Sequence, residues 1–181
     1  MGRSPPFRLA PRVLRMNVGF IHPGEMGAVL ASAAECPVMW ASEARSDESR
    51  RRARENGVVD VGTMVELVNR SDVLVSVCPP HAAMDVASEV DRIGFDGIFV
   101  DANAVSPATV REIAAHFDRF VDGGIIGPPP RESGTTRLYL AGLDASTVAL
   151  GWENSNVDVR LLPGRVGSAS AIKAAYAGWT K

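Results

Sequence analysis

Short runs of β-branched and apolar residues alternate with amphipathic or alanine-rich stretches along almost the whole chain, and this alternation limits the fold more than any other feature. It is typical of strand–helix–strand units, in which each helix returns the chain so that successive strands lie parallel. We expect strands at 17–21, 38–40, 58–59, 73–77, 98–101, 120–121, 137–141 and 157–161. We expect helices at 25–34, 47–56, 61–69, 81–93, 107–117, 145–152 and 168–181. The sequence therefore predicts an α/β protein with a doubly wound, mostly parallel sheet that ends in a long helix.

The composition is that of a soluble globular domain. Of the 181 residues, 46% are hydrophobic and 22% are charged. No stretch of about 18 uninterrupted apolar residues occurs, so we expect no membrane-spanning helix. Cys36 and Cys78 are too few for a disulfide framework and too isolated for a zinc site. We expect both to be buried small hydrophobes in a cytoplasmic, reducing environment, and we expect no bound metal.

Charge is distributed unevenly. Four of the 19 basic residues lie in the first 15 positions, which leaves 15 basic residues against 21 acidic ones in the remainder. A net acidic body argues against nucleic-acid binding, because phosphate contacts need clustered Lys and Arg. We expect residues 1–15 to be a disordered leader, 16–166 to be a dinucleotide-binding domain, and 167–181 to begin an interdomain helix. Met16, one residue before the first strand, is a candidate translation start.

The first expected strand leads into a glycine-containing turn, His22-Pro23-Gly24-Glu25-Met26-Gly27, followed by a helix. This is the place where dinucleotides bind in α/β sheets, because glycines let the backbone approach a pyrophosphate whose charge lies at the helix N-terminus. A strand-to-helix turn of purely structural use is the alternative. His22 stands where the first glycine of the motif is expected, and it either donates a hydrogen bond to phosphate or is a simple strand-end histidine.

Further polar and glycine-containing motifs follow the later strands. The strand at 73–77 ends in Cys78-Pro79-Pro80, and the strand at 98–101 is followed by Asn103 and Ser106-Pro107. The segment 122–128 includes Gly127, and Lys173 lies in the last helix. Ligands bind at the carboxyl ends of the strands in open α/β folds, so we expect these motifs to meet at one edge.

The order and spacing of these motifs resemble the β-hydroxyacid dehydrogenase superfamily, specifically the NADP-binding domain of the 6-phosphogluconate dehydrogenase type. The resemblance covers 17–181. It implies that Gly24, Met26 and Gly27 line the cofactor pyrophosphate and the adjacent turn, and that Cys78, Pro79 and Pro80 lie along the cofactor. It places Asn103, Ser106 and Gly127 at the substrate, Asn103 also beside the cofactor. Lys173 matches the lysine that the family uses for proton transfer.

The chemistry of Lys173 can be argued independently. Removing a hydride from an alcohol leaves a proton on oxygen, which a nearby base must accept. A lysine performs this role at neutral pH only if burial or positive neighbours lower its pKa. A surface lysine that keeps its ammonium group in solvent is the alternative. Related imine reductases generally lack this lysine, which disfavours that activity.

The cofactor choice depends on the residues after the second strand. NAD enzymes of this architecture place an Asp or Glu there to hold the ribose hydroxyls, whereas a guanidinium suits a 2′-phosphate. The sequence offers Arg45 and Ser46 for the phosphate, with Glu43 as the feature favouring NAD. We therefore expect NADP, with NAD as the alternative. The run Arg50-Arg51-Arg52 indicates a solvated helix face, and the alternative is that one of its members reaches the same phosphate.

These features predict an NADP-dependent oxidoreductase that interconverts a small 3-hydroxyacid and its oxo form. Two departures from the family pattern, His22 and Ala177, favour as an alternative a dinucleotide-binding module without turnover. A methyltransferase that uses S-adenosylmethionine is a further alternative. The last helix has an apolar stripe of Ile172, Tyr176 and Trp179, so we expect a homodimer through it or contact with an absent helical domain. The alternative is a terminal helix that packs on its own sheet. No nucleic-acid or membrane partner is expected.

Overall fold

The expected strands form one continuous sheet in the structure, a computed structural model that describes residues 16–179. The strands are β1 (Val18–Phe20), β2 (Val38–Trp40), β3 (Val59–Asp60), β4 (Val73–Ser76), β5 (Ile98–Asp101), β6 (Phe120–Ile126), β7 (Thr136–Ala141) and β8 (Val157–Leu161). Their order is β3-β2-β1-β4-β5-β6-β7-β8. β1 to β6 are parallel, β7 is antiparallel to β6, and β8 is parallel to β7. This is a Rossmann-like α/β fold, so the predicted doubly wound sheet is confirmed.

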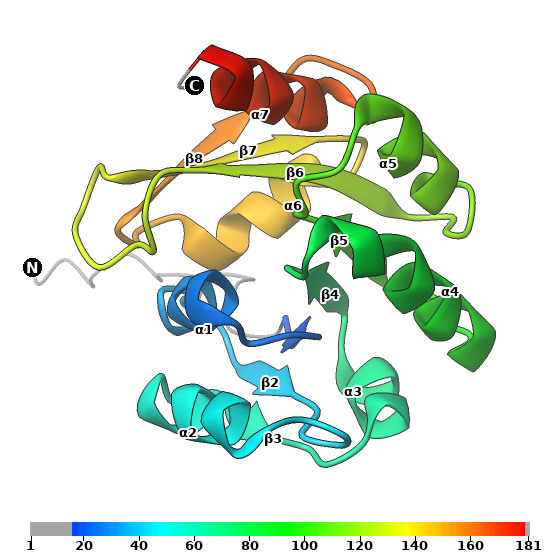
Figure 1. The fold of residues 1–181 in the computed structure, drawn as a ribbon, viewed down its shortest axis with the longest axis vertical. Coiled ribbons are helices and arrows are strands. Elements are labelled where there is room, and N and C mark those ends of the chain that lie inside the picture. Colours follow the sequence, from blue (N-terminus) through cyan, green and yellow to red (C-terminus); the bar gives the residue numbers. More distant parts are fainter. Residues whose placement is uncertain (1–15, 180–181) are drawn as a thin grey trace, which may run out of the picture.

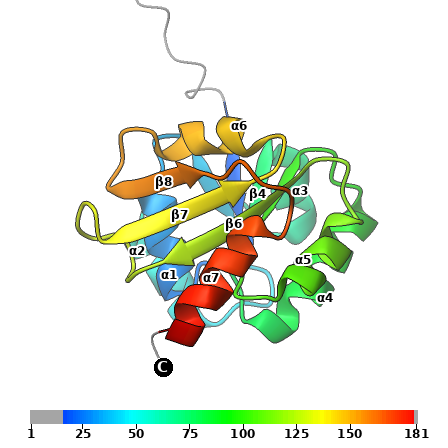
Figure 2. The same ribbon diagram turned by 90° about the horizontal axis from the view of Figure 1, so that it is seen from above.

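Helices cover both faces of the sheet (Figure 1). One face is covered by α1 (Glu25–Ser32), α2 (Asp47–Glu55) and α6 (Ala145–Ala149), which continues into the 3-10 turn η3 (Leu150–Trp152). The other face is covered by α3 (Met64–Arg70), α4 (Ala83–Ile93), which follows the 3-10 turn η2 (Pro80–Ala82), α5 (Pro107–Ala114) and α7 (Ser168–Trp179). Figure 2 shows α7 lying across β6 and β7.

Each face has its own hydrophobic core, because the inner strands of a parallel sheet are apolar on both sides. On the face of α1, Phe20 packs edge-to-face on Trp152, with ring centroids 6.3 Å apart. On the opposite face, Phe99 stacks on Phe117 with a centroid separation of 4.2 Å. The two cores hold the strand ends in fixed positions, and the candidate site lies at those ends.

The largest difference from the expected elements is β6, which continues through Ile126 where the sequence suggested a loop. Two glycines inside it explain the difference. A Cβ added to Gly124 would lie 2.8 Å from the Ala169 carbonyl oxygen, and one added to Gly123 would lie 3.1 Å from the Cβ of Ala102. Glycine is therefore needed here because α7 and the chain after β5 approach this strand closely.

Helix α3 begins at Met64, three residues later than expected. Asp60 Oδ1 accepts a hydrogen bond from the Gly62 amide at 2.9 Å, which folds the preceding residues into a turn. Thr63 then caps the helix, because its hydroxyl accepts from the Glu66 amide at 3.1 Å. Local side-chain hydrogen bonds therefore decide this boundary, which hydrophobic periodicity does not reveal.

Helix α7 packs on the sheet at its start and is exposed toward its end. Ala169 and Ser170 are buried, Ile172 is half-buried, and Trp179 is 91% exposed. The part of the predicted apolar stripe near Trp179 therefore lies at the surface. No helix within 16–179 has both the length and the apolar character needed to cross a membrane.

Candidate functional site

The turn between β1 and α1 leaves open space beside Gly24, and this space is called the Gly24 cradle. Gly24 has an extended backbone conformation, and a Cβ added there would have no atom within 4 Å, so nothing in the described chain requires a glycine at this position. Gly27 differs, since its Cβ would lie 2.6 Å from the His22 carbonyl oxygen, and glycine here allows close helix–strand packing. No described side chain caps the start of α1. The turn is therefore shaped to let an external group approach the backbone.

The other residues predicted in this turn have different surroundings. Pro23 is buried, Glu25 is exposed, and Met26 is half-buried and packs against the core. Glu25 also borders a cavity of about 300 Å³ under the β6–β7 hairpin, together with Pro129 and Arg131. Met26 thus supports the turn from inside and does not line the cradle.

Two buried nitrogen atoms beside the cradle make no hydrogen bond. They are His22 Nδ1 and Arg45 Nε, and neither has a partner among residues 16–179. Burial, and secondarily the charge of Arg45, lower the pKa of His22 to about 4. Because buried polar atoms are nearly always satisfied, an orphaned pair at a ligand-binding edge suggests an absent polar ligand.

Arg45 lies in the turn between β2 and α2 and is half-buried. Its charge acts on His22 and also on Cys78, whose pKa is raised chiefly by burial and is lowered in part by Arg45. Ala44, the residue before it, has φ of 54°, a left-handed conformation that is costly for alanine. Arg45 therefore follows a strained turn and interacts electrostatically with residues that follow β1 and β4.

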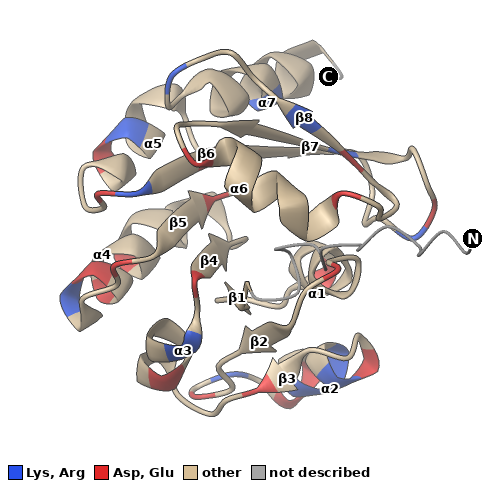
Figure 3. Ribbon diagram, turned by 180° about the vertical axis from the view of Figure 1, so that it is seen from behind, with Lys and Arg blue, Asp and Glu red and all other residues tan. Residues whose placement is uncertain are grey.

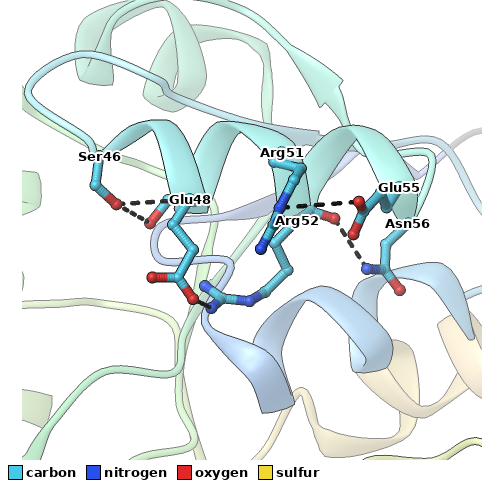
Figure 4. Close-up of polar contacts among 7 residues, drawn as sticks. Ser46, Glu48, Arg51, Arg52, Glu55 and Asn56 are labelled. Carbon is cyan, nitrogen blue, oxygen red and sulfur yellow. Dashed lines mark hydrogen bonds and ion pairs between the residues drawn. The ribbon is translucent and has the colours of Figure 1, made fainter.

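The arginine run on α2 has local partners instead (Figure 4). Arg52 donates to Glu48 at 2.6 Å, and Arg51 lies 3.9 Å from Glu55. Ser46 caps the helix, because its hydroxyl accepts from the Ser49 amide at 3.2 Å. Charges of both signs consequently alternate on this helix (Figure 3). Arg45 differs from these residues, because its buried Nε has no partner among residues 16–179.

Asn103 joins the ends of β4 and β5. Its side-chain oxygen accepts from the Cys78 amide at 2.6 Å, and its Nδ2 donates to Ser76 Oγ at 3.0 Å and to Asp101 Oδ2 at 2.8 Å. Its residue exposure is 1%. Both hydrogens of the side-chain amide are donated to other residues of the protein. Asn103 therefore positions the start of the segment Cys78-Pro79-Pro80 through its hydrogen bond from the Cys78 amide. Pro80 starts η2, which turns this segment along the edge.

Two buried aspartates stand side by side, because Asp101 at the end of β5 pairs in register with Asp122 within β6. Asp122 accepts from the amides of Gly167 and Ala169, both at 2.8 Å. It also accepts from the Ser170 amide at 3.2 Å and hydroxyl at 2.6 Å. Asp122 therefore anchors the start of α7, the helix that bears Lys173.

Lys173 is half-buried, and burial lowers its pKa, while the charge of Asp101 opposes this shift. Burial in turn raises the pKa of Asp101 to about 6, despite the hydrogen bonds from Asn103. Lys173 therefore interacts electrostatically with Asp101, the last residue of β5. Lys173 is therefore a candidate proton-transfer group within the same site as Asn103.

Two predicted substrate residues have structural tasks. The Ser106 hydroxyl caps α5 by accepting from the Thr109 amide at 3.1 Å. Gly127 has φ of 117° and begins the hairpin to β7, where a Cβ would collide with the Thr135 carbonyl oxygen. His22, Arg45, Asn103 and Lys173 thus all lie in the part of the fold that follows the carboxyl ends of the parallel strands or contacts it. The presence of Ser106 and Gly127, by contrast, is explained by a helix cap and a hairpin turn.

The sequence reasoning missed Asp101, Asp122 and Ser170 as site residues. Asp101 and Asp122 each follow apolar residues within a strand, and a carboxylate in a buried strand is the signal that points to them. Ser170 gives no such signal, because a serine in an alanine-rich helix is common.

Comparison with known proteins supports the interpretation of the fold. No protein-family model matches the chain. It is 31% identical over 170 residues to a Methanothermus fervidus protein named "uncharacterized 28.5 kDa protein in 7S RNA 5′ region", covering 92% of this chain and 66% of that one. A solved structure, the conserved protein MTH1747 of unknown function, shows similarity with 3-hydroxyacid dehydrogenases. It is 30% identical with a TM-score of 0.80, covering 91% of this chain and 64% of that chain.

More distant structures share the fold. They are an imine reductase from Myxococcus stipitatus with NAD+ (21% identity, TM-score 0.69), a 3-hydroxyisobutyrate dehydrogenase from Mycobacterium tuberculosis with L-serine (17%, 0.72), and a reductive aminase from Aspergillus terreus with NADPH (16%, 0.71). Matches cover 89% to 91% of this chain and 58% to 61% of those chains. The structural neighbours are thus 3-hydroxyacid dehydrogenase-like NAD(P)-binding Rossmann proteins, and this chain spans less than two thirds of their length.

Proposed function

We propose that the chain is the NADP-binding part of an oxidoreductase of the 6-phosphogluconate dehydrogenase type, acting on a small 3-hydroxyacid and its oxo form. The observation that supports cofactor binding most directly is the open cradle at Gly24 beside the unpartnered nitrogens of His22 and Arg45. A phosphate would satisfy both nitrogens, and Gly24 would let it reach the backbone of α1. The bound nicotinamide of the neighbouring structures supports the same class of ligand.

Lys173 would transfer the proton. When the cofactor is bound, its nicotinamide supplies or accepts the hydride. In the reductive direction the protonated Lys173 gives a proton to the oxygen that becomes the hydroxyl group, and in the oxidative direction neutral Lys173 accepts it. Burial favours the neutral form, and Asp101 keeps the protonated form accessible.

Fluorescence titration with NADPH and NADH tests the cofactor proposal. We expect saturable NADPH binding that is lost in Gly24→Asp, since a carboxylate in the cradle would repel the pyrophosphate. Arg45→Ala should weaken NADPH roughly tenfold or more, the value of one charge-assisted phosphate contact, and NADH much less. Arg51→Ala, which removes a surface arginine paired with Glu55, is the control and should leave both affinities unchanged.

Two results would contradict the proposal. Equal losses of NADPH and NADH in Arg45→Ala would exclude the assignment of the 2′-phosphate to this residue. Absence of binding of either nucleotide, with tight binding of S-adenosylmethionine, would favour the methyltransferase alternative. Turnover assays with 3-hydroxyacids and their semialdehydes on the gene's full product then separate an active enzyme from a binding module.

A further inference from the structure

We propose that His22 is a ligand of a cofactor phosphate and takes up a proton from solvent when the dinucleotide binds, so that binding tightens as the pH falls. This inference rests on the proposed function. It adds to it a linkage between ligand and proton at a position where the dinucleotide motif has a glycine.

The geometry around His22 supports a missing anion. The ring is half-buried, its Nδ1 is buried without a partner, and the buried Nε of Arg45 is in the same condition. The backbone of His22 is already used, since its carbonyl oxygen accepts from the Gly24 amide at 2.8 Å. The side-chain Nδ1 is therefore the unsatisfied atom of a residue that lies two positions before Gly24 in the same turn.

Arg45, from the turn after β2, is the charged group that acts on His22, and its charge adds to burial in lowering the pKa of His22. Glu43 of the same turn accepts from the Met64 amide at 3.4 Å. Glu25, three residues after His22, is exposed. The charge of Arg45 also acts on Cys78, which follows β4. An anion between His22 and Arg45 would replace their repulsion by attraction to both.

The protonation state of the imidazole determines how it binds phosphate. A neutral imidazole has one N–H donor, and a protonated imidazole has two and a positive charge. Phosphate oxygens are acceptors only, so they favour the protonated form. Free His22 has a pKa of about 4 and is neutral above that pH. A bound phosphate raises the pKa, and a proton moves from buffer to the ring nitrogen upon binding.

The sign of the pH dependence follows. Between the free and bound pKa values, lowering the pH favours the complex by up to about tenfold in affinity per unit. A pyrophosphate diester does not change its charge between pH 5.5 and 8. A 2′-phosphate does, with a pKa of about 6, and its protonation opposes the effect of His22. ADP-ribose, which has only the pyrophosphate, and 2′-phospho-ADP-ribose are therefore informative probes.

The test is isothermal titration calorimetry of the chain with both probes, in two buffers that differ in ionisation enthalpy. Across pH 5 to 7.5 we expect net proton uptake that grows as the pH falls, with an affinity that rises by at most about tenfold per pH unit. His22→Gln, which keeps an N–H donor but does not titrate in this range, should abolish the uptake and flatten the pH profile. His116→Gln is the matched control, because His116 pairs with Asp91 on other elements.

The two probes distinguish the phosphate involved. A His22-dependent proton uptake with ADP-ribose assigns His22 to the pyrophosphate, and uptake confined to 2′-phospho-ADP-ribose assigns it to the 2′-phosphate. Both results support the proposal. Binding without proton uptake, or uptake that persists in His22→Gln, would overturn it while leaving the proposed function intact. Failure of both probes and of NADPH to bind would instead remove the proposed function.

Discussion

At the scale of single residues, the candidate site depends on two charged side chains, Lys173 and Asp101, that are partly or fully removed from solvent. Asp101 is buried and Lys173 is half-buried, and burial moves each of them toward its neutral form. Their opposite charges restrain both shifts. The result is an acid and a base with pKa values closer to neutrality than those of exposed side chains, a property of groups that transfer protons.

Removing the charge of Asp101 should therefore change the titration of Lys173. The sequence has two lysines, Lys173 and Lys181, so labelling lysine Cε with carbon-13 gives two NMR signals, which Lys173→Arg assigns. We expect Lys173 to titrate below the ordinary value of 10.5. Asp101→Asn should lower its midpoint further, because the ammonium loses its counter-charge.

Asp118→Asn is the control for that titration, since Asp118 is exposed in the turn after α5. It should leave the Lys173 midpoint unchanged. A midpoint at or above 10.5 in the unmodified chain, or no response to Asp101→Asn, would contradict the role assigned to this pair.

Part of the site could be predicted from local sequence alone. The turn from His22 to Gly27 follows a strand and precedes a helix, and Arg45 follows the second strand, so chain order is sufficient to place them at one edge. Asp101 and Asp122 needed the three-dimensional register of β5 and β6. Asn103 was identified, but its hydrogen bonds to Ser76 and Cys78 show an internal positioning task that the sequence does not reveal.

At the scale of elements, α7 is held by one carboxylate. Asp122 accepts hydrogen bonds from Gly167, Ala169 and Ser170, and so satisfies amides that a helix start leaves without partners. A negative charge at this end also opposes the positive end of the helix dipole. The anchor fixes α7 about one turn before Lys173.

Asp122→Asn tests this anchor. The asparagine side chain would retain one acceptor oxygen, but its NH2 group would face the backbone N–H donors at the start of α7. We therefore expect the free energy of unfolding to fall by about 2 to 4 kcal/mol. Asp158→Asn, which removes a surface partner of Arg160, should cost about 0 to 1 kcal/mol. Urea denaturation of both variants measures the difference. Equal, small losses would show that Asp122 is not the anchor.

The element boundaries were predictable where periodicity and capping signals agree. Ser106 and Pro107 begin α5 as expected, because the hydroxyl cap and the proline at the first turn act together. β6 was underestimated because Gly123 and Gly124 resemble loop residues in isolation. These glycines are needed because Ala102, after β5, and Ala169, in α7, approach the strand closely. Both alanines are distant from the glycines in sequence, so the local sequence does not indicate the strand.

At the scale of the whole molecule, Trp152 joins the late part of the chain to the first strand and helix. Its indole N–H donates to the Leu30 carbonyl oxygen at 2.9 Å, and its ring packs against Phe20. Leu30 belongs to α1, the helix that follows the Gly24 cradle. The segment between β7 and β8, which contains Trp152, therefore stabilises the position of α1, the helix that follows the candidate cofactor site.

Trp152→Phe should weaken this support without leaving a large cavity. The Leu30 carbonyl oxygen would lose a buried partner, which costs about 1 to 3 kcal/mol. We expect a lower midpoint of urea denaturation with an unchanged slope, as expected for a loss of stability without a change in fold. Trp179→Phe is the matched control, because Trp179 is 91% exposed and its replacement should have little effect. A similar loss in both variants would contradict the role of Trp152.

The register of β5 and β6 is coupled to the docking of α7. Side chains alternate across a strand, so a slip of β6 by one residue would turn Asp122 to the opposite face of the sheet. The backbone amides at the start of α7 would then have no carboxylate to receive them. Docking of the last helix with all of its hydrogen bonds therefore requires the native pairing of these two strands, and it penalises a misregistered sheet.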